Sequence, residues 1–140
     1  MATIFSKIIA GELPGRFVWR DDRVVAFLTI EPLTPGHTLI VPIAEVDHWL
    51  ELPDDLADHV MRVARAVGRG IERAFDCERV SLIIAGFEVP HVHIHVSGAN
   101  SMSDLDFSRV TRDAPPEALD AAAAALRGAL RELGYSEASE

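Results

Sequence analysis

Three of the six histidines in this chain lie within five residues, in the stretch HVHIHV at 91–96. They alternate strictly with valine and isoleucine. In an extended strand, side chains two residues apart project from the same face, about 6.6–7 Å apart. The alternation therefore predicts a strand with an apolar face on the core and an opposite face that carries His91, His93 and His95. Three imidazoles in register are hard to explain as structural residues, because each brings a donor and an acceptor that must be satisfied.

The residue pattern around this stretch predicts an α+β fold. Short segments rich in β-branched and aromatic residues predict further strands at 17–20, 24–30, 37–41 and 80–85. Apolar residues at steps of three or four predict helices over 53–75 and about 116–133. This order favours an antiparallel sheet with helices on one face, in which one long helix packs on the sheet and a second helix follows near the C-terminus.

The length and composition of the chain limit the classes of protein to which it can belong. A chain of 140 residues fits a single domain, and the segment 98–115 is long enough to cover a site or a partner surface. A net charge of −9 provides no basic patch for long nucleic acid. The single cysteine excludes an intrachain disulfide, and the chain has neither a charged leader with a long apolar run nor a membrane-spanning stretch. These features predict a cytoplasmic protein with no membrane partner.

Two kinds of chemistry suit the histidines. A His-x-His pair on a strand can begin a zinc site, with His37 or Glu88 as a third ligand. Alternatively, a neutral imidazole is a good nucleophile near pH 7, and its neighbours can bind a phosphoryl group and act as acid. The spacing of the histidines alone leaves both interpretations open.

The sequence resembles the histidine triad (HIT) superfamily, and specifically its Hint-like branch. HVHIHVS fits the signature His-x-His-x-His-x-x, where x is apolar. Four blocks resemble that branch in order and spacing: TIFSKIIAGELPG at 3–15, DDRVVAFLTIEP at 21–32, PGHTLIVP at 35–42 and AGFEVPHVHIHV at 85–96. The resemblance covers residues 3–97, which implies a HIT-like catalytic core over 1–97. Residues 98–140 are then expected to be a C-terminal loop and helix of the same domain.

The resemblance implies a nucleotide-binding hydrolase or nucleotidyl transferase that acts at the α-phosphate, typically of nucleoside phosphoramidates. It implies a homodimer with a sheet extended across both subunits, a purine nucleotide as ligand, and neither a cofactor nor a metal in the chemistry. His93 matches the family nucleophile, and His95 the position that contacts the phosphate and the leaving group. His91 would support the row, and His37 would hydrogen-bond into it and fix tautomers.

The positions expected to bind the nucleoside match the family pattern less closely than the histidines do. Positions that enclose the base in the family are matched by Ile4, Phe5, Ile8, Phe27 and Ile30. Thr29 stands where the family usually has an aspartate that binds the ribose hydroxyls, so ribose binding should weaken. The loop before Gly86 is shortened, Phe87 replaces a glutamine, and Glu88 falls where the branch has a serine or threonine near the leaving group. A carboxylate there would repel a phosphate unless it is protonated or paired, or it could take a proton from an amine leaving group.

A structural zinc site and two alternative functions also have to be considered. Some relatives hold a structural zinc with an N-terminal Cys-x-x-Cys pair; Thr3 and Ser6 occupy those positions here, so no structural zinc is expected. The same fold could serve as a non-catalytic nucleotide-binding or protein-interaction module. A metal-dependent hydrolase that uses His91, His93 and His37 is the remaining alternative.

Overall fold

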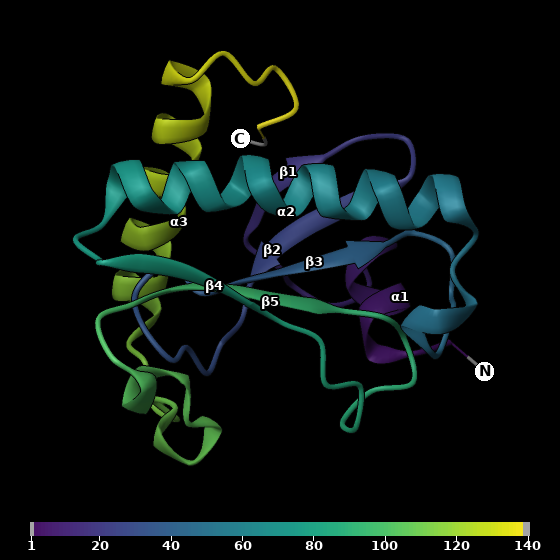
Figure 1. Ribbon diagram of the computed structural model, residues 1–140, viewed down its shortest axis with the longest axis horizontal. Coiled ribbons are helices and arrows are strands. Elements are labelled where there is room, and N and C mark those ends of the chain that lie inside the picture. The colour runs from purple at the N-terminus through teal and green to yellow at the C-terminus, as the bar shows by residue number, and fades with distance from the viewer. Residues whose placement is uncertain (1, 139–140) are drawn as a thin grey trace.

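Strands pair in the order β1-β2-β3-β5-β4, and every neighbouring pair is antiparallel, in a computed structural model that describes residues 2–138 (Figure 1). The strands are β1 (Phe17–Arg20), β2 (Val24–Leu28), β3 (Thr38–Pro42), β4 (Arg79–Ile83) and β5 (Ile94–Ala99). The α-helices are α1 (Ile4–Ile9), α2 (Asp54–Ala74) and α3 (Pro116–Glu132). Short 3-10 helices lie at Trp49–Glu51, Met102–Leu105 and Phe107–Arg109. The α+β architecture predicted from the sequence is confirmed.

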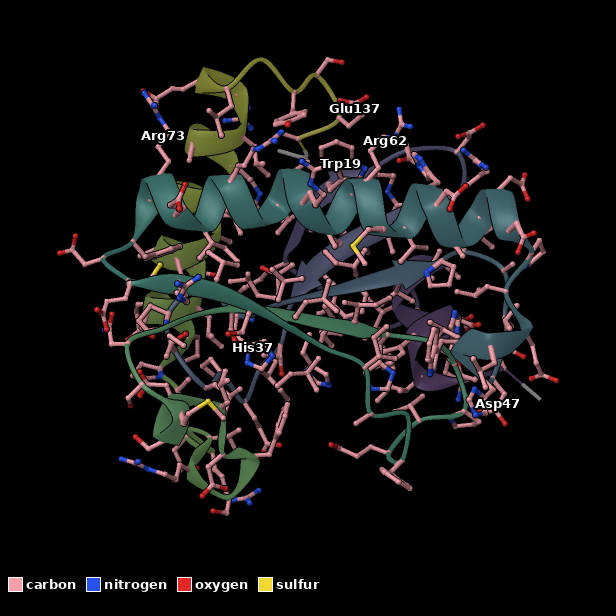
Figure 2. All side chains as sticks on the ribbon, in the orientation of Figure 1. Trp19, His37, Asp47, Arg62, Arg73 and Glu137 are labelled. Carbon is pink, nitrogen blue, oxygen red and sulfur yellow. The ribbon has the colours of Figure 1, made fainter. Side chains whose placement is uncertain are left out.

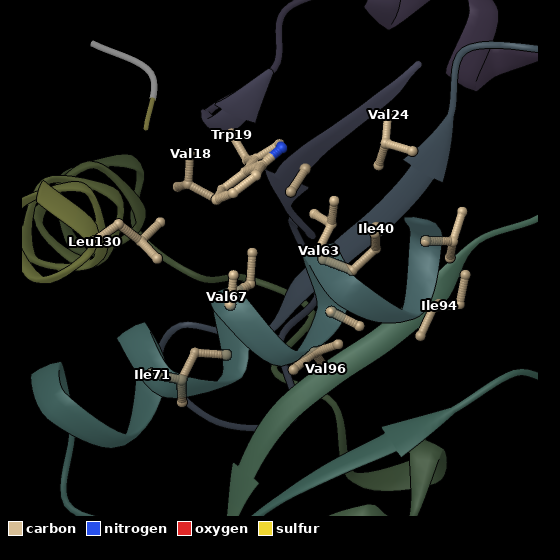
Figure 3. Close-up of a cluster of buried hydrophobic side chains, with 14 of the residues drawn as sticks. Val18, Trp19, Val24, Ile40, Val63, Val67, Ile71, Ile94, Val96 and Leu130 are labelled. Atoms are coloured by element: carbon tan, nitrogen blue, oxygen red, sulfur yellow. The ribbon is translucent and has the colours of Figure 1, made fainter. Parts of the chain in front are cut away.

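Helix α2 crosses one face of the sheet along its whole length (Figure 1). It begins directly after Pro53, with Asp54 and Asp55 in its first turn, where carboxylates suit the positive end of the helix dipole. Its apolar stripe is buried against side chains of the sheet and of α3 (Figure 3). The stripe consists of Leu56, Val60, Val63, Val67 and Ile71. Because both long helices follow the apolar period, the predicted bounds are close to the observed ones.

Helix α1 lies on the opposite face of the sheet, whereas the sequence predicted helices on one face only. Phe5 of α1 packs with Val25 and Phe27 of β2, and their neighbours Val24 and Ala26 face α2. Thr3 caps the helix, since its side chain accepts a hydrogen bond from the backbone of Ser6. The helix has six residues, too few for an apolar period to identify it.

Strand β5 begins at Ile94, so two of the three clustered histidines precede it. The backbone N–H of Val92 donates to the carbonyl of Val46 rather than to a neighbouring strand. The strand predicted from HVHIHV at 91–96 therefore begins later than expected and runs on to Ala99. The predicted alternation persists, because Val92, Ile94 and Val96 all lie in the core under α2. Within residues 2–138, no helix is both long and apolar enough to cross a membrane.

Candidate active site

The histidine row, defined as His91, His93 and His95, lies on the face of the sheet opposite α2. All three side chains are buried, as is His37, which projects below the sheet in Figure 2. The rings of His93 and His95 lie 5.2 Å apart between centroids. Phe5 of α1 packs edge-on against His93, with centroids 4.9 Å apart. The structure thus brings together the four histidines that the sequence singled out.

Hydrogen bonds to backbone atoms determine which nitrogen of His93 is protonated. Its Nδ1 lies 2.8 Å from the carbonyl oxygen of His91. A carbonyl oxygen can only accept, so Nδ1 must carry the proton and donate it. In the neutral ring, Nε2 of His93 then has a free lone pair. The fold therefore leaves Nε2 as the ring nitrogen with an available lone pair, which is the arrangement that nucleophilic chemistry requires.

A similar argument fixes the tautomer of His95. The backbone N–H of Leu33 donates to Nδ1 of His37 at 2.9 Å, so the proton of the neutral His37 ring is on Nε2. Nε2 of His37 lies 3.0 Å from Nδ1 of His95 and donates to it. Nε2 of neutral His95 consequently carries a proton. The site presents an acceptor nitrogen on His93 beside a donor N–H on His95.

Burial keeps this pair neutral. Desolvation, reinforced by the neighbouring His95, lowers the pKa of His37 to about 3. Desolvation, reinforced by His93, lowers the pKa of His95 to about 4. Both rings are therefore uncharged at pH 7, as the alternation of donors and acceptors requires.

His91 is held from the N-terminal segment. Its Nε2 donates to the carbonyl oxygen of Pro42 at 2.8 Å, so its Nδ1 accepts from the hydroxyl of Thr3 at 2.7 Å. Ser6 extends the cluster, because its hydroxyl donates to Glu45 at 2.6 Å. This hydrogen bond lowers the pKa of Glu45. Thr3 and Ser6, the positions of the cysteine pair in some relatives, thus belong to a hydrogen-bonded cluster that includes His91.

The predicted nucleoside-binding residues divide into two groups. Phe5 and Phe27 are buried and in contact, with centroids 5.7 Å apart, and Ile8 packs beside them. Ile4 is 51% exposed and Ile30 is 69% exposed, so these two are not ordinary core residues. Phe5, Phe27, Ile8 and the exposed Ile4 therefore form an apolar surface at α1, on the same face as the histidine row.

Two pockets adjoin the histidine row. The predicted polar residues Thr29 and Glu88 line the first, and Gly86 lines the second. A pocket of about 250 Å³ is lined by residues of four segments: Thr29, Glu31, His37, Glu88, His95, Phe107, Val110 and Arg112. A second pocket, of about 210 Å³, includes His93 together with Gly86, Phe87, Trp49 and other residues. Gly86 has a φ of +81°, which glycine adopts without strain. The ring of Phe87 beside it is 95% exposed.

Several residues of the site were missed by the sequence analysis. Phe107 lies edge-on to His95, with centroids 4.8 Å apart, and Arg112 pairs with Glu31. Both Phe107 and Arg112 come from the segment after β5, where the motif resemblance ends. Glu45 accepts hydrogen bonds from Ser6 and from the backbone of Thr3, whose hydroxyl in turn bonds to His91. No local pattern identifies these residues, because their partners are far away in the sequence.

The donor geometry does not suit the metal-site alternative. His37 and His95 bond to each other, and His93 bonds to the backbone through Nδ1. Among residues 2–138, no group of three or more His, Cys, Asp or Glu side chains is placed to hold a metal ion. Each imidazole is therefore oriented by a hydrogen bond to the backbone or to another side chain, and the rings do not converge as ligands.

Comparison with known proteins agrees with this geometry. The model of the HIT domain family matches residues 10–102. An uncharacterized HIT-like protein of Methanocaldococcus jannaschii is 40% identical over 97 residues, which are 66% of this chain and 75% of that protein. The crystal structure of a hypothetical histidine triad nucleotide-binding protein from Sulfolobus tokodaii has a TM-score of 0.80 at 27% identity, with 92% of each chain covered. A HIT-like protein involved in cell-cycle regulation from Bartonella henselae gives a TM-score of 0.78 at 26% identity, covering 91% of this chain and 95% of that one. With its family motif and its fold both matched, this chain belongs to the HIT domain family, in the histidine triad superfamily.

Proposed function

We propose that this protein is a nucleotide-binding hydrolase or nucleotidyl transferase that acts on the α-phosphorus of nucleoside phosphoramidates or related mixed phosphates. Family membership supports the general kind of activity. The observation that carries the specific proposal is the protonation pattern of the row. Nε2 of His93 has a free lone pair, and Nε2 of His95 offers an N–H next to it.

The reaction follows from this pattern. Nε2 of His93 attacks the α-phosphorus, and an N–P bond forms as the bond to the leaving nitrogen breaks. The leaving amine takes a proton through solvent, while His95 donates a hydrogen bond to the phosphoryl oxygens and stabilises their charge. Water then attacks the nucleotidyl-histidine, which releases a nucleoside monophosphate and a proton and restores neutral His93. His37 is a positioning residue, because it acts through His95.

The apolar surface next to α1 supports a purine nucleotide as the ligand. Phe5 and Phe27 form its buried floor, and the exposed side chains of Ile4 and Ile30 are available to enclose a base. Phe5 also contacts His93. A base bound there would place its 5′-phosphate near the nucleophile.

The test is the hydrolysis of adenosine and guanosine 5′-phosphoramidates in the presence of a chelator, with the natural protein and with His93→Ala. We expect turnover by the natural protein that persists in chelator and falls at least about a thousandfold in the variant. His59→Gln is the control, because His59 lies away from the row and pairs with Asp21. Loss of activity in chelator, or full activity of His93→Ala, would overturn the proposal.

A non-catalytic nucleotide-binding module is the second candidate. The observation in its favour is Glu88, whose carboxylate lines the pocket that contains His95 and would hold the α-phosphate of a bound nucleotide away from His95. Nucleotides that bind to the natural protein without any turnover would favour this function.

We also propose a homodimer, on the evidence of β4. This strand lies at the edge of the sheet, pairs with β5 on one side, and has a half-exposed leucine, Leu82. An unpaired edge of this kind is available for pairing with a second copy. Sedimentation equilibrium measures the mass directly, and a monomer at micromolar concentration would contradict the proposal.

A further inference from the structure

The pocket beside His95 combines catalytic and recognition elements. His37 and His95 line it together with Thr29, Glu31 and Glu88 and with residues of the segment after β5. Its volume is about 250 Å³. A ligand whose phosphorus meets His95 at this pocket has polar side chains within reach that the chemical step does not use.

The segment after β5 is fixed against this pocket. The backbone N–H of Thr111 donates to the carbonyl of Pro32 at 3.0 Å. The ring of Phe107 lies edge-on to His95 and, at 6.3 Å between centroids, to His37 as well. Arg112 is thereby held next to Glu31, and Nη1 of Arg112 lies 3.5 Å from Oε2 of Glu31.

This ion pair restrains the carboxylate and leaves it able to bind a ligand. The side chains are 65% exposed for Arg112 and 45% exposed for Glu31, so the pair contributes little to stability. A carboxylate has about four acceptor sites on its two oxygens, and the contact with Arg112 engages one oxygen. Glu31 therefore lines the pocket and retains acceptor capacity.

The charge of the pocket selects the kind of group that it can bind. Its charged side chains are the carboxylates of Glu31 and Glu88 and the guanidinium of Arg112, which leaves a formal charge of about −1 at neutral pH. A second anionic group is disfavoured there. A neutral group with hydroxyl donors fits, and the ribose 2′,3′-diol is such a group; carboxylates bind ribose hydroxyls in this way in dinucleotide-binding proteins.

The position of Thr29 fits this assignment. Its hydroxyl oxygen accepts a hydrogen bond from the backbone N–H of Glu31 at 3.2 Å, so it orients the residue that carries the carboxylate. Because this N–H uses one of the two acceptor sites of the hydroxyl oxygen, Thr29 cannot also accept two ribose hydroxyl protons as a carboxylate can. A carboxylate from Glu31 supplies what Thr29 lacks.

We propose that Glu31 recognises the ribose hydroxyls of the bound nucleotide, with Arg112 as the positioning residue for its carboxylate, so that the protein selects ribonucleotides over deoxyribonucleotides. This inference rests on the proposed function for the identity of the ligand. It assigns a role in specificity to the Glu31–Arg112 pair, and neither residue takes part in the attack on phosphorus.

Two measurements test the proposal. The first is the ratio of kcat/KM for an adenosine 5′-phosphoramidate and its 2′,3′-dideoxy counterpart. The second is the dissociation constant of AMP and of 2′,3′-dideoxy-AMP by titration calorimetry, which does not depend on turnover. Both are applied to the natural protein, Glu31→Gln, Arg112→Gln and Arg112→Lys. Arg109→Gln is the matched control, since Arg109 belongs to the same segment but does not line the pocket.

We expect the natural protein and Arg109→Gln to prefer the ribonucleotide by about tenfold or more, the effect of a hydrogen bond to a charged group. Glu31→Gln should reduce this preference to within about twofold through KM, with little change for the dideoxy compound. Arg112→Gln should reduce it partly, and Arg112→Lys should restore it. Adding Thr29→Asp to Glu31→Gln should return a carboxylate to the pocket and recover the preference.

The outcomes separate this inference from the proposed function. An unchanged preference in Glu31→Gln, or equal losses for both compounds, would overturn the inference even if phosphoramidates are hydrolysed through His93. Discrimination in binding that Glu31→Gln abolishes, without any turnover, would support the inference while the proposed chemistry fails. Binding that strengthens when a phosphate is added to the ribose, and weakens in Arg112→Gln, would assign Arg112 to an anion and overturn the role of Glu31.

Discussion

Nε2 of His37 donates a hydrogen bond to Nδ1 of His95 at 3.0 Å, and both rings are buried. Because Nδ1 of neutral His95 accepts this hydrogen bond, the single ring N–H proton of His95 must be on Nε2. A backbone N–H, that of Leu33, fixes the orientation of His37 in turn. The protonation state of the site is thus determined by the backbone through one intermediate residue.

We therefore expect His37→Phe to lower kcat about tenfold and to leave KM within about twofold of the natural value. Phenylalanine fills a similar volume but cannot donate, so His95 loses the partner that sets its tautomer. Loss of one hydrogen bond of about 1.4 kcal/mol in the transition state corresponds to that factor. Steady-state kinetics on an adenosine phosphoramidate measure both constants. A kcat that does not change would show that His95 keeps its tautomer without His37.

The lowered pKa values predict that stability falls in mildly acidic solution. The pKa of His37 is about 3 and that of His95 about 4, both below the ordinary 6.5. Between about pH 6.5 and pH 4 the unfolded chain therefore binds more protons than the folded one, and the free energy of unfolding decreases as the pH falls, by up to about 1.4 kcal/mol per pH unit for each group. Urea unfolding at a series of pH values measures this slope. His37→Phe should show a shallower slope, and an equal slope would refute the assignment.

The part of the fold that depends on the periodicity of apolar residues could be predicted from the sequence. Helix α2 was predicted to within one residue at each end, because its buried stripe repeats every three or four residues. The histidine row was recognised from alternation, which persists although β5 begins only at Ile94. Helix α1 was missed because six residues are too short to show a period, and the cap at Thr3 alone does not identify a helix.

Contacts between distant segments could not be predicted in this way. Arg112 and Glu31 are 81 residues apart, and Thr3 and His91 are 88 apart. No local propensity encodes such pairs, since they exist only after the sheet has brought the segments together. Thr29 was expected to weaken ribose binding, which remains a prediction; the neighbouring Glu31 has to be tested alongside it.

Thr3 connects the N-terminus to the row, so we expect Thr3→Val to destabilise the protein by about 1–2 kcal/mol. Valine has nearly the same shape but loses both the cap of α1 and the hydrogen bond to Nδ1 of His91. Thr3→Ser retains the hydroxyl and should stay within about 0.5 kcal/mol of the natural protein. Urea unfolding measures the difference. If Thr3→Val were as stable as Thr3→Ser, the cluster would not contribute to stability.

Substitution by alanine is expected to have opposite effects on stability at two glycines, one on each long helix. A Cβ at Gly70 of α2 would lie 2.8 Å from Cδ1 of Leu126 and 2.9 Å from Cδ2 of Leu130, both buried side chains of α3. We expect Gly70→Ala to destabilise the protein by about 1–3 kcal/mol, because the two helices must move apart.

A Cβ at Gly128 of α3 would meet no atom within 4 Å among the described residues. Gly128→Ala should therefore stabilise the protein by about 0.5–1 kcal/mol, since alanine loses less backbone entropy in a helix. Thermal and urea unfolding of both variants check the pair of predictions. Equal stabilisation by the two substitutions would mean that α2 and α3 are not in close contact at Gly70.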